Sequence, residues 1–216
     1  MDESELRLLE LIAARMCHDL VGPVGASVNG AELLAEGEAA DAEVVRLIGQ
    51  SARQASRRLQ VFRVAYGTPG ALSGGRPFAQ AGQLLAAMLE GEKASVDWQV
   101  DLALDAACGR VGARLALLVA LIGVEALARG GVLRVSGAVS GARATIEAQA
   151  AGPNAKFPDE TAAALRGSIP LAQMTAKAAP AELARRLAVA AGGGLELADT
   201  PQGPVLRATL AAELSS

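Results

Sequence analysis

The sequence predicts an α+β protein, in which a hairpin of two long helices precedes a layered domain of helices and strands. Apolar residues recur every three or four positions over 4–36 and over 41–66, as they do along one face of a helix. After a stretch rich in Gly, Pro and Ser, helical and strand-like segments alternate. We therefore divide the 216 residues into a helical domain at 1–68 and an α/β domain at 69–216.

The first helix is predicted over 4–36 and has one apolar seam. Pro23 removes a backbone hydrogen bond, so we expect a bend near the preceding turn. The acid-rich stretch EGEAAD (36–41) is predicted to form the turn that ends this helix. The seam consists of Leu9, Ala13, Met16, Leu20, Val24, Val28, Ala31 and Leu34.

The second helix, over 41–66, has a seam with the alternating three- and four-residue spacing of a heptad repeat. Two long helices joined by a short turn form an antiparallel hairpin, and each seam then has a single neighbour within the chain. A second copy would close a four-helix bundle, so we expect a homodimer. The seam consists of Val45, Ile48, Ala52, Ala55, Leu59, Phe62 and Tyr66.

The remainder of the chain begins with a predicted linker, GTPGALSGGRP (67–77). Helices packed on one face of a mostly antiparallel sheet would bury the many small apolar residues that follow it. We predict helices at 78–90, 110–129, 159–166 and 180–191, and strands at 95–102, 131–139, 143–150, 195–199 and 204–210.

The composition argues against several classes of function. The formal net charge of −3 disfavours nucleic acid as the main partner. Two cysteines without paired spacing and one histidine are too few for a zinc site, and we expect reduced thiols. The charged N-terminus lacks the features of a signal peptide. The longest apolar stretch, 115–128, is too short to span a bilayer and contains Glu125. We expect a cytoplasmic protein with no membrane partner.

The segment MCHDLVGP (16–23) contains the only histidine of the chain. A lone histidine in an apolar helix is usually a packing residue. His18, however, lies midway between the seam positions Met16 and Leu20 and therefore points away from the seam. This position favours a functional role for His18 over a role in packing.

The neighbours of His18 indicate which chemistry it could perform. Gly22 and Gly25 supply no side-chain bulk, so another protein could approach the imidazole closely; flexibility beside the proline is the alternative reason for them. A neutral imidazole can act as a nucleophile or base, and Asp19 can hold one of its tautomers. Cys17 lies about 100° around the helix, and no serine or second base forms a triad. Acceptance of a phosphoryl group therefore fits best.

These residues resemble a known family. The pair His18–Asp19, with Pro23 five positions after the histidine, is similar to the H-box of histidine-kinase phosphotransfer domains. MCHDLVGPVGA, SAR (51–53) and FRVAYG (62–67) resemble the ChpT-type histidine phosphotransferases of alphaproteobacteria. The resemblance covers the whole chain. It implies a dimeric four-helix bundle followed by a degenerate histidine-kinase ATPase-like α/β sandwich.

The family relays phosphoryl groups between receiver-domain aspartates in multistep phosphorelays, which implies roles for single residues. His18 would be the phosphoacceptor, Asp19 would orient or assist its imidazole, and Pro23 would match the bend. Gly22 stands where phosphatase-competent kinases commonly have Thr or Asn, so direct phosphatase activity through it is not implied. The partners would be receiver domains of a hybrid histidine kinase and of response regulators. They would bring Mg²⁺, so the chain itself needs no cofactor.

A kinase-type ATPase domain needs three nucleotide-binding elements, and the resemblance indicates that all three have lost their chemistry here. Gly123 or Val124 stands where an Asn would hold magnesium. Ala150 replaces the aspartate of the adenine loop, and Asn154 replaces its second glycine. The segment 176–194 has no glycine-rich entry loop. We therefore expect neither ATP binding nor autokinase activity.

The span 44–89 contains six arginines and no Asp or Glu. A solvated helix face explains most such runs, but a basic flank would also steer an acidic receiver domain toward the histidine. We expect Arg15, with Gly22, Pro23 and Arg63, to contribute to partner docking. RNA binding is a competing use, which the lack of lysine and of exposed aromatic candidates disfavours. The six arginines are Arg46, Arg53, Arg57, Arg58, Arg63 and Arg76.

Two other functions stay open. The chain could be a histidine kinase with a divergent nucleotide site, which binding of labelled ATP would reveal. It could instead be a non-catalytic dimeric adaptor that binds a signalling protein. An adaptor should keep its cellular role when His18 is replaced by alanine.

Overall fold

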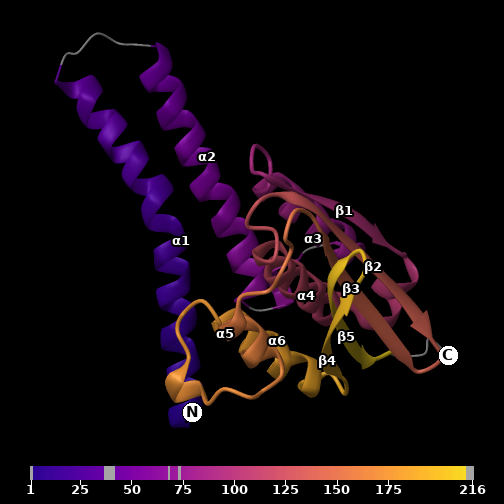
Figure 1. Cartoon of the computed structure of the whole chain (residues 1–216). Coiled ribbons are helices and arrows are strands. Elements are labelled where there is room, and N and C mark those ends of the chain that lie inside the picture. Colours follow the sequence, from indigo (N-terminus) through magenta and orange to yellow (C-terminus); the bar gives the residue numbers. More distant parts are fainter. Residues whose placement is uncertain (1, 37–41, 68, 73, 213–216) are drawn as a thin grey trace.

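The first two helices form a hairpin. Helix α1 (Glu3–Ala35) and helix α2 (Ala42–Ala65) run antiparallel and project from the rest of the molecule (Figure 1). The helical hairpin predicted from the two seams is confirmed, although its turn, predicted at 36–41, falls mostly outside the described residues. The structure is a computed structural model that describes residues 2–36, 42–67, 69–72 and 74–212.

The local sequence explains where α1 begins. The Asp2 carboxylate accepts the backbone N–H of Glu5 at 2.7 Å, and the Glu5 carboxylate accepts that of Asp2 at 2.9 Å. This capping box satisfies backbone donors that the first turn of a helix leaves free. The helix then continues without interruption through Pro23.

Helices and five strands form the described part of the chain after the hairpin. The helical elements are α3 (Pro77–Met88), α4 (Ala103–Glu125), α5 (Asp159–Leu165) and α6 (Ala179–Ala190), with single 3₁₀ turns at Pro69–Ala71 and Leu171–Gln173. The strands are β1 (Ala94–Val100), β2 (Gly131–Ser140), β3 (Arg143–Ala151), β4 (Gly194–Thr200) and β5 (Gly203–Ala211).

The strands form one mixed sheet in the order β1-β2-β3-β5-β4. Strand β1 is parallel to β2, and the other neighbouring pairs are antiparallel. The helices and strands predicted for this part of the chain are confirmed, with shifts at their ends. The largest shift is in α4, which begins at Ala103 rather than at 110 and has a kink at Gly109, where φ is 52°.

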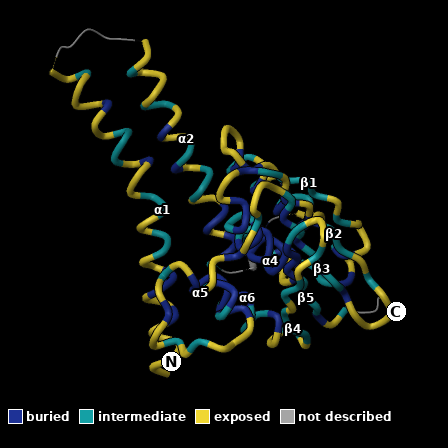
Figure 2. Tube along the Cα trace, viewed as in Figure 1, coloured by how far each residue is buried: buried dark blue, intermediate teal, exposed yellow. Residues whose placement is uncertain are grey.

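One face of the sheet is covered by helices and the other is polar. Along β3, Ala144, Ile146 and Ala148 have no exposed surface, whereas Thr145 and Glu147 between them are partly exposed. Helices α3, α4 and α6 pack against the sheet. Figure 2 shows that the buried residues are concentrated where helices and strands face each other. The predicted α+β arrangement, with helices on one face of a mostly antiparallel sheet, is confirmed.

The base of the hairpin shares its core with the α/β part. Leu8 of α1 and Phe62 of α2 belong to the same apolar cluster as Leu117 of α4. The stretch 67–77 is predicted as a linker, but Leu72 within it has no exposed surface. At Leu72 this stretch is therefore part of the core, rather than a free linker. The predicted division of the chain at residue 68 stays a prediction.

Helix α4 is the central helix of the fold. By length and composition alone it could cross a membrane, because the helix begins earlier than the sequence predicts. Of its most apolar window, 61% is buried inside the protein. Leu117 and Leu118 at its centre have no exposed surface. The apolar character of α4 is therefore explained by its place in the core.

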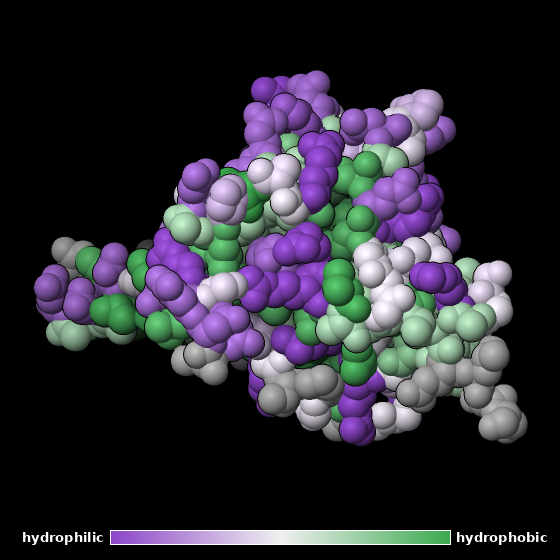
Figure 3. All heavy atoms as spheres, turned by 90° about the horizontal axis from the view of Figure 1, so that it is seen from below, coloured by the Kyte–Doolittle hydropathy of each residue, from purple (hydrophilic) through white to green (hydrophobic). Residues whose placement is uncertain are grey.

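The outer part of the hairpin leaves much of both predicted seams exposed. Val24 and Val28 of α1 and Val45 and Leu59 of α2 keep between 48% and 53% of their surface exposed. Hydrophobic atoms are visible at the surface of the projecting hairpin, at the left of Figure 3. These four positions of the seams are therefore left largely uncovered by the opposite helix. The residues of α1 that are buried are instead Leu8, Leu11, Ile12, Pro23 and Gly30.

Candidate functional site

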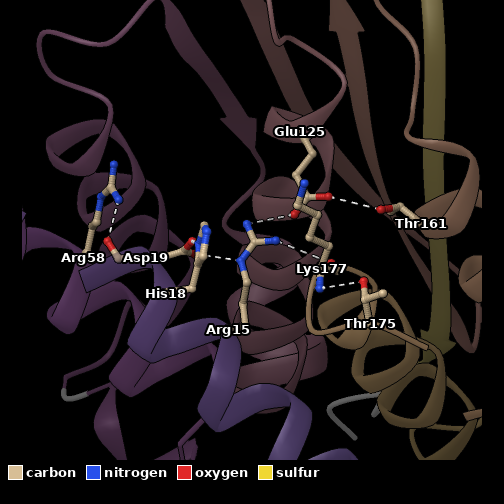
Figure 4. Close-up of polar contacts among 8 residues, drawn as sticks. All are labelled: Arg15, His18, Asp19, Arg58, Glu125, Thr161, Thr175 and Lys177. Atoms are coloured by element: carbon tan, nitrogen blue, oxygen red, sulfur yellow. Dashed lines mark hydrogen bonds and ion pairs between the residues drawn. The ribbon is translucent and has the colours of Figure 1, made fainter. Parts of the chain in front are cut away.

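His18 lies near the middle of α1, with its ring outside the core. Its side chain is 77% exposed, and ring atom Nδ1 lies 3.1 Å from Oδ1 of Asp19 (Figure 4). The packing interpretation of this histidine is therefore wrong. Because Nδ1 is turned toward a carboxylate, the other ring nitrogen, Nε2, is the one available to a partner.

Asp19 connects the histidine to the interior. Its side chain is only 18% exposed, and its Oδ2 accepts a 2.7 Å hydrogen bond from Nε of Arg15, one helical turn earlier. The carboxylate thus uses one oxygen for the arginine and the other for the imidazole. A carboxylate held in this way favours the tautomer of the ring that carries its proton on Nδ1.

Arg15 in turn reaches the α/β part. Its Nη2 lies 3.1 Å from Oε1 of Glu125, at the end of α4, and its Nη1 donates to the carbonyl of Lys177 over 3.5 Å. The other oxygen of Glu125 accepts the hydroxyl of Thr161 on α5 at 3.3 Å. Three elements that are distant in the sequence therefore meet at the side of α1 that carries His18 (Figure 4).

Burial governs the ionisation of this cluster. It raises the pKa of the Glu125 carboxyl, an effect that the charge of Arg15 partly opposes. It would lower the pKa of the Arg15 guanidinium, but the attraction of Glu125 and Asp19 outweighs it and the pKa is raised. Burial also raises the pKa of the nearby Tyr66 hydroxyl. Arg15 therefore stays charged and Tyr66 stays neutral near neutral pH.

The backbone of Asp19 is held as well. In a regular helix its carbonyl would accept the N–H of Pro23, which proline lacks. Nη1 of Arg58 on α2 donates to this carbonyl at 2.6 Å instead. Nη2 of Arg58 lies 3.7 Å from Oε1 of Glu92, just before β1. A second arginine thus links Asp19 to the α/β part.

The predicted docking residues lie in different environments. Gly22 is exposed, and apart from the backbone of its own helix no atom of the described residues lies within 4 Å of the place a Cβ would take. Arg63 is exposed at the far end of α2, whereas Pro23 is buried. Arg15 is 20% exposed and is already engaged by two acids. Their contribution to docking stays a prediction.

A cavity of about 230 Å³ opens beside Asp19, among α1, α2 and α4. Two arginines and three acids line it, so its positive charges are already balanced by carboxylates. The cavity is therefore a poor binding site for an anionic ligand. Its charged residues are Arg15, Asp19, Arg58, Glu92 and Glu125.

The arginine-rich stripe of α2 is less basic than its sequence indicates. Arg57 forms an ion pair with Glu90, and Arg58 pairs with the glutamate two positions further on. These acids, Glu90 and Glu92, come just after the span 44–89, which contains no Asp or Glu, and lie in the turn that follows α3. Arg53 and Arg63 are exposed, and neither has an ion pair within the described part of the chain. The charges of Arg57 and Arg58 are therefore balanced by acids, whereas those of Arg53 and Arg63 are not balanced by any described residue.

Glu125 is the member of the site that sequence reasoning misses. In the sequence it stands out only as an interruption of an apolar stretch. An acid in a buried helix needs a cation or hydrogen-bond donors, so a contact with an arginine was predictable. The identity of that arginine was not, because Arg15 lies in a separate helix that only the tertiary fold brings near.

Gly123, and Gly152 between Ala150 and Asn154, lie in close-packed surroundings. A Cβ on Gly123 would lie 2.6 Å from Cδ1 of Leu133, and one on Gly152 would lie 2.3 Å from the carbonyl oxygen of Gly130. Gly152 is therefore required by its close approach to the backbone, whereas a side chain at position 123 would need Leu133 to shift. The lack of ATP binding stays a prediction.

Comparison with known proteins agrees with this architecture. Residues 78–203 match the family model of the histidine phosphotransferase C-terminal domain. Over 132 residues the chain is 39% identical to protein phosphotransferase ChpT of Brucella abortus (strain 2308). This match spans 61% of this chain and 61% of that relative, about three fifths of its length.

Similarity to solved structures extends over the whole chain. One structure, described as a 1.7 Angstrom structure of a bacterial phosphotransferase, matches with a TM-score of 0.76 and 29% identity. The match covers 99% of this chain and 98% of that one. Because the family model matches more than half of the sequence, the chain belongs to the histidine phosphotransferase family.

Proposed function

We propose that this protein is a histidine phosphotransferase of a multistep phosphorelay, with His18 as the phosphoacceptor. The observation that carries the proposal is the exposed imidazole whose Nδ1 faces Asp19 at 3.1 Å. This arrangement leaves Nε2 as the nucleophile, in a chain that belongs to the histidine phosphotransferase family.

The reaction is a reversible in-line displacement. Nε2 attacks the phosphorus of a phosphoaspartate on a receiver domain, an N–P bond forms, and the P–O bond to the aspartate breaks. The receiver carboxylate leaves with the electron pair of that bond. The ring, already protonated on Nδ1, becomes positive, and Asp19 stabilises this charge at Oδ1. The reverse reaction, on a second receiver, returns the phosphoryl group to an aspartate.

The proposed partners are receiver domains of a hybrid histidine kinase and of response regulators, in the cytoplasm. The receiver supplies the Mg²⁺ for the transfer, so the chain needs no metal of its own. Gly22 lies one turn beyond His18 and offers no side chain that would obstruct an approaching domain. Arg53 and Arg63 are exposed cations that would attract the acidic face of a receiver.

We propose a homodimer in which two hairpins form a four-helix bundle. The exposed rows of apolar side chains on α1 and α2 support this assembly, because a lone hairpin leaves them in water. No autokinase activity is expected. The degenerate ATPase-like domain would instead act as part of the transfer site.

Transfer of label from a phosphorylated receiver tests the function. Wild-type protein incubated with such a receiver and Mg²⁺ should acquire label, and His18→Ala should acquire none. Label that arrives from ATP without any receiver would favour a kinase. A His18→Ala variant that keeps the full cellular role of the protein would favour an adaptor.

A further inference from the structure

Two acids compete for one arginine beside His18. Nε of Arg15 donates to Oδ2 of Asp19 at 2.7 Å, while Nη2 of the same guanidinium lies 3.1 Å from Oε1 of Glu125. Figure 4 shows the Arg15 guanidinium between these two carboxylates. The hairpin supplies the arginine and Asp19, and the α/β part supplies Glu125.

Arg15 divides its donors between the two acids, and this division determines which oxygen of Asp19 is available to His18. Nε and Nη2 together form the fork with which an arginine binds both oxygens of one carboxylate. A guanidinium with a free Nη2 at this distance would take Oδ1 as well as Oδ2 of Asp19. Oδ1 would then be shared between the guanidinium and Nδ1 of His18, which lies 3.1 Å from it, and would be a weaker acceptor for the imidazole. Because Nη2 is drawn toward Glu125, Oδ1 faces the imidazole without competition from the guanidinium.

We propose that Glu125 is a positioning residue for phosphotransfer, which withholds Nη2 of Arg15 from Asp19. It thereby keeps His18 in the tautomer that is protonated on Nδ1 and unprotonated on Nε2. This proposal rests on the proposed function of His18. It gives the α/β part a direct share in the chemistry that requires no nucleotide.

The other charged groups near Asp19 do not duplicate this role. Arg58 of α2 uses Nη1 for the carbonyl oxygen of Asp19 and turns Nη2 toward Glu92. Arg58 therefore fixes the backbone of Asp19 and leaves its carboxylate to Arg15.

The remaining contacts hold Glu125 and Arg15 in place. The hydroxyl of Thr161 donates to Oε2 of Glu125 at 3.3 Å, which directs Oε1 to the arginine. The carbonyl of Lys177 accepts from Nη1 of Arg15, which turns the outer edge of the guanidinium away from Asp19.

Imidazole tautomers can be read directly in this protein. The chain has one histidine, so the ¹⁵N spectrum of protein labelled with ¹⁵N-histidine reports on His18 alone. At about pH 9, where a histidine ring is neutral, the full-length wild type should show the pattern of the Nδ1–H tautomer. Glu125→Gln removes the charge that holds Nη2 and keeps the size of the side chain. It should shift the ring toward Nε2–H and slow label transfer from a phosphorylated receiver about 10-fold.

A second substitution distinguishes positioning from general damage. A lysine at position 15 has no fork, so the double variant R15K/E125Q should restore the Nδ1–H tautomer. A merely structural role of Glu125 would not be corrected in this way. The matched control is Glu182→Gln, because Glu182 is also buried and also pairs with two arginines, Arg185 and Arg186, on α6. It should keep the wild-type tautomer.

The outcomes separate this proposal from the proposed function. A Glu125→Gln spectrum identical to that of the wild type overturns it, as does a double variant that stays in the Nε2–H form. If Glu125→Gln does not fold, Arg15→Lys alone decides: retention of Nδ1–H supports the proposal and its loss overturns it. The tautomer is measured without any receiver. A shifted spectrum in E125Q, together with a wild type that accepts no label, would therefore support the positioning and contradict only the proposed function.

Discussion

Nη1 of Arg58 donates at 2.6 Å to the carbonyl oxygen of Asp19, the carbonyl that Pro23 leaves without its helical N–H. The proline therefore opens an acceptor one residue after His18, and a side chain of α2 fills it. Pro23 thus links the two helices of the hairpin beside the proposed phosphoacceptor, and α1 continues through it without a break.

Replacing Arg58 by methionine should destabilise the protein. The carbonyl of Asp19 would lose its donor in a partly buried position, which costs about 1–3 kcal/mol of the free energy of unfolding. The neighbouring Arg57→Met is the control, because Arg57 forms only a partly exposed ion pair with Glu90 and should contribute less than about 1 kcal/mol. Urea unfolding of both variants measures the difference. Equal losses would contradict the role of Arg58.

Replacing Gly22 by alanine should separate stability from activity. Space is open around this position, so the helix should gain up to about 1 kcal/mol. The added methyl group would nevertheless hinder a receiver that approaches His18, and phosphotransfer should become slower. Thermal unfolding and label transfer from a phosphorylated receiver measure the two effects. Gly49→Ala, far along α2, should be neutral for transfer, and an equally fast G22A variant would refute close docking at Gly22.

A charge on the exposed seam should dissociate the proposed dimer. Val28 is 49% exposed on the outer part of α1, and a glutamate there would be buried without a partner in a four-helix bundle. Val28→Glu should sediment as a monomer at concentrations at which the wild type is a dimer. Val189→Glu on α6, where Val189 is 59% exposed, should leave the assembly unchanged. A wild type that is itself monomeric would rule out the bundle.

Stability should depend on pH through Glu182. Burial would raise the pKa of its carboxyl, but hydrogen bonds from Arg185 and Arg186 outweigh this effect and lower it. An acid whose folded-state pKa is lowered stabilises the fold above its ordinary pKa, and this contribution is lost as the pH falls through the lowered value. Glu182→Gln should therefore be less stable than the wild type by about 1–3 kcal/mol at neutral pH. Urea unfolding should show the difference shrinking below about pH 4, and a constant difference would argue against this origin.

Much of the fold follows from the periodicity of the sequence. The two helical seams predict the hairpin, and alternating segments such as 143–150 predict strands because every second residue is buried against the helices. The seams do not show which partner covers them, since that depends on how the chain packs. The sequence also does not predict the start of α4, because the kink at Gly109 interrupts the helical pattern.

The candidate site is predicted only where its residues are close in sequence. His18 and Asp19 are neighbours, and the exposure of His18 follows from its place on the helix. Glu125 and Arg58 reach Asp19 from other helices, so only the tertiary structure joins them. The ion pair between Glu90 and Arg57 of α2 is likewise known only from the tertiary structure, because Glu90 lies outside the span of sequence that contains the arginines.

The nitrogen of His18 that carries the phosphoryl group can be identified directly by NMR. Protein labelled with ¹⁵N-histidine would be phosphorylated by a phosphorylated receiver, and the coupling between ³¹P and ¹⁵N would be recorded. We predict phosphorus bonded to Nε2 of His18, with Nδ1 protonated and facing Asp19. Phosphorus bonded to Nδ1, or a histidine that never acquires phosphorus while receivers lose theirs, would contradict this prediction.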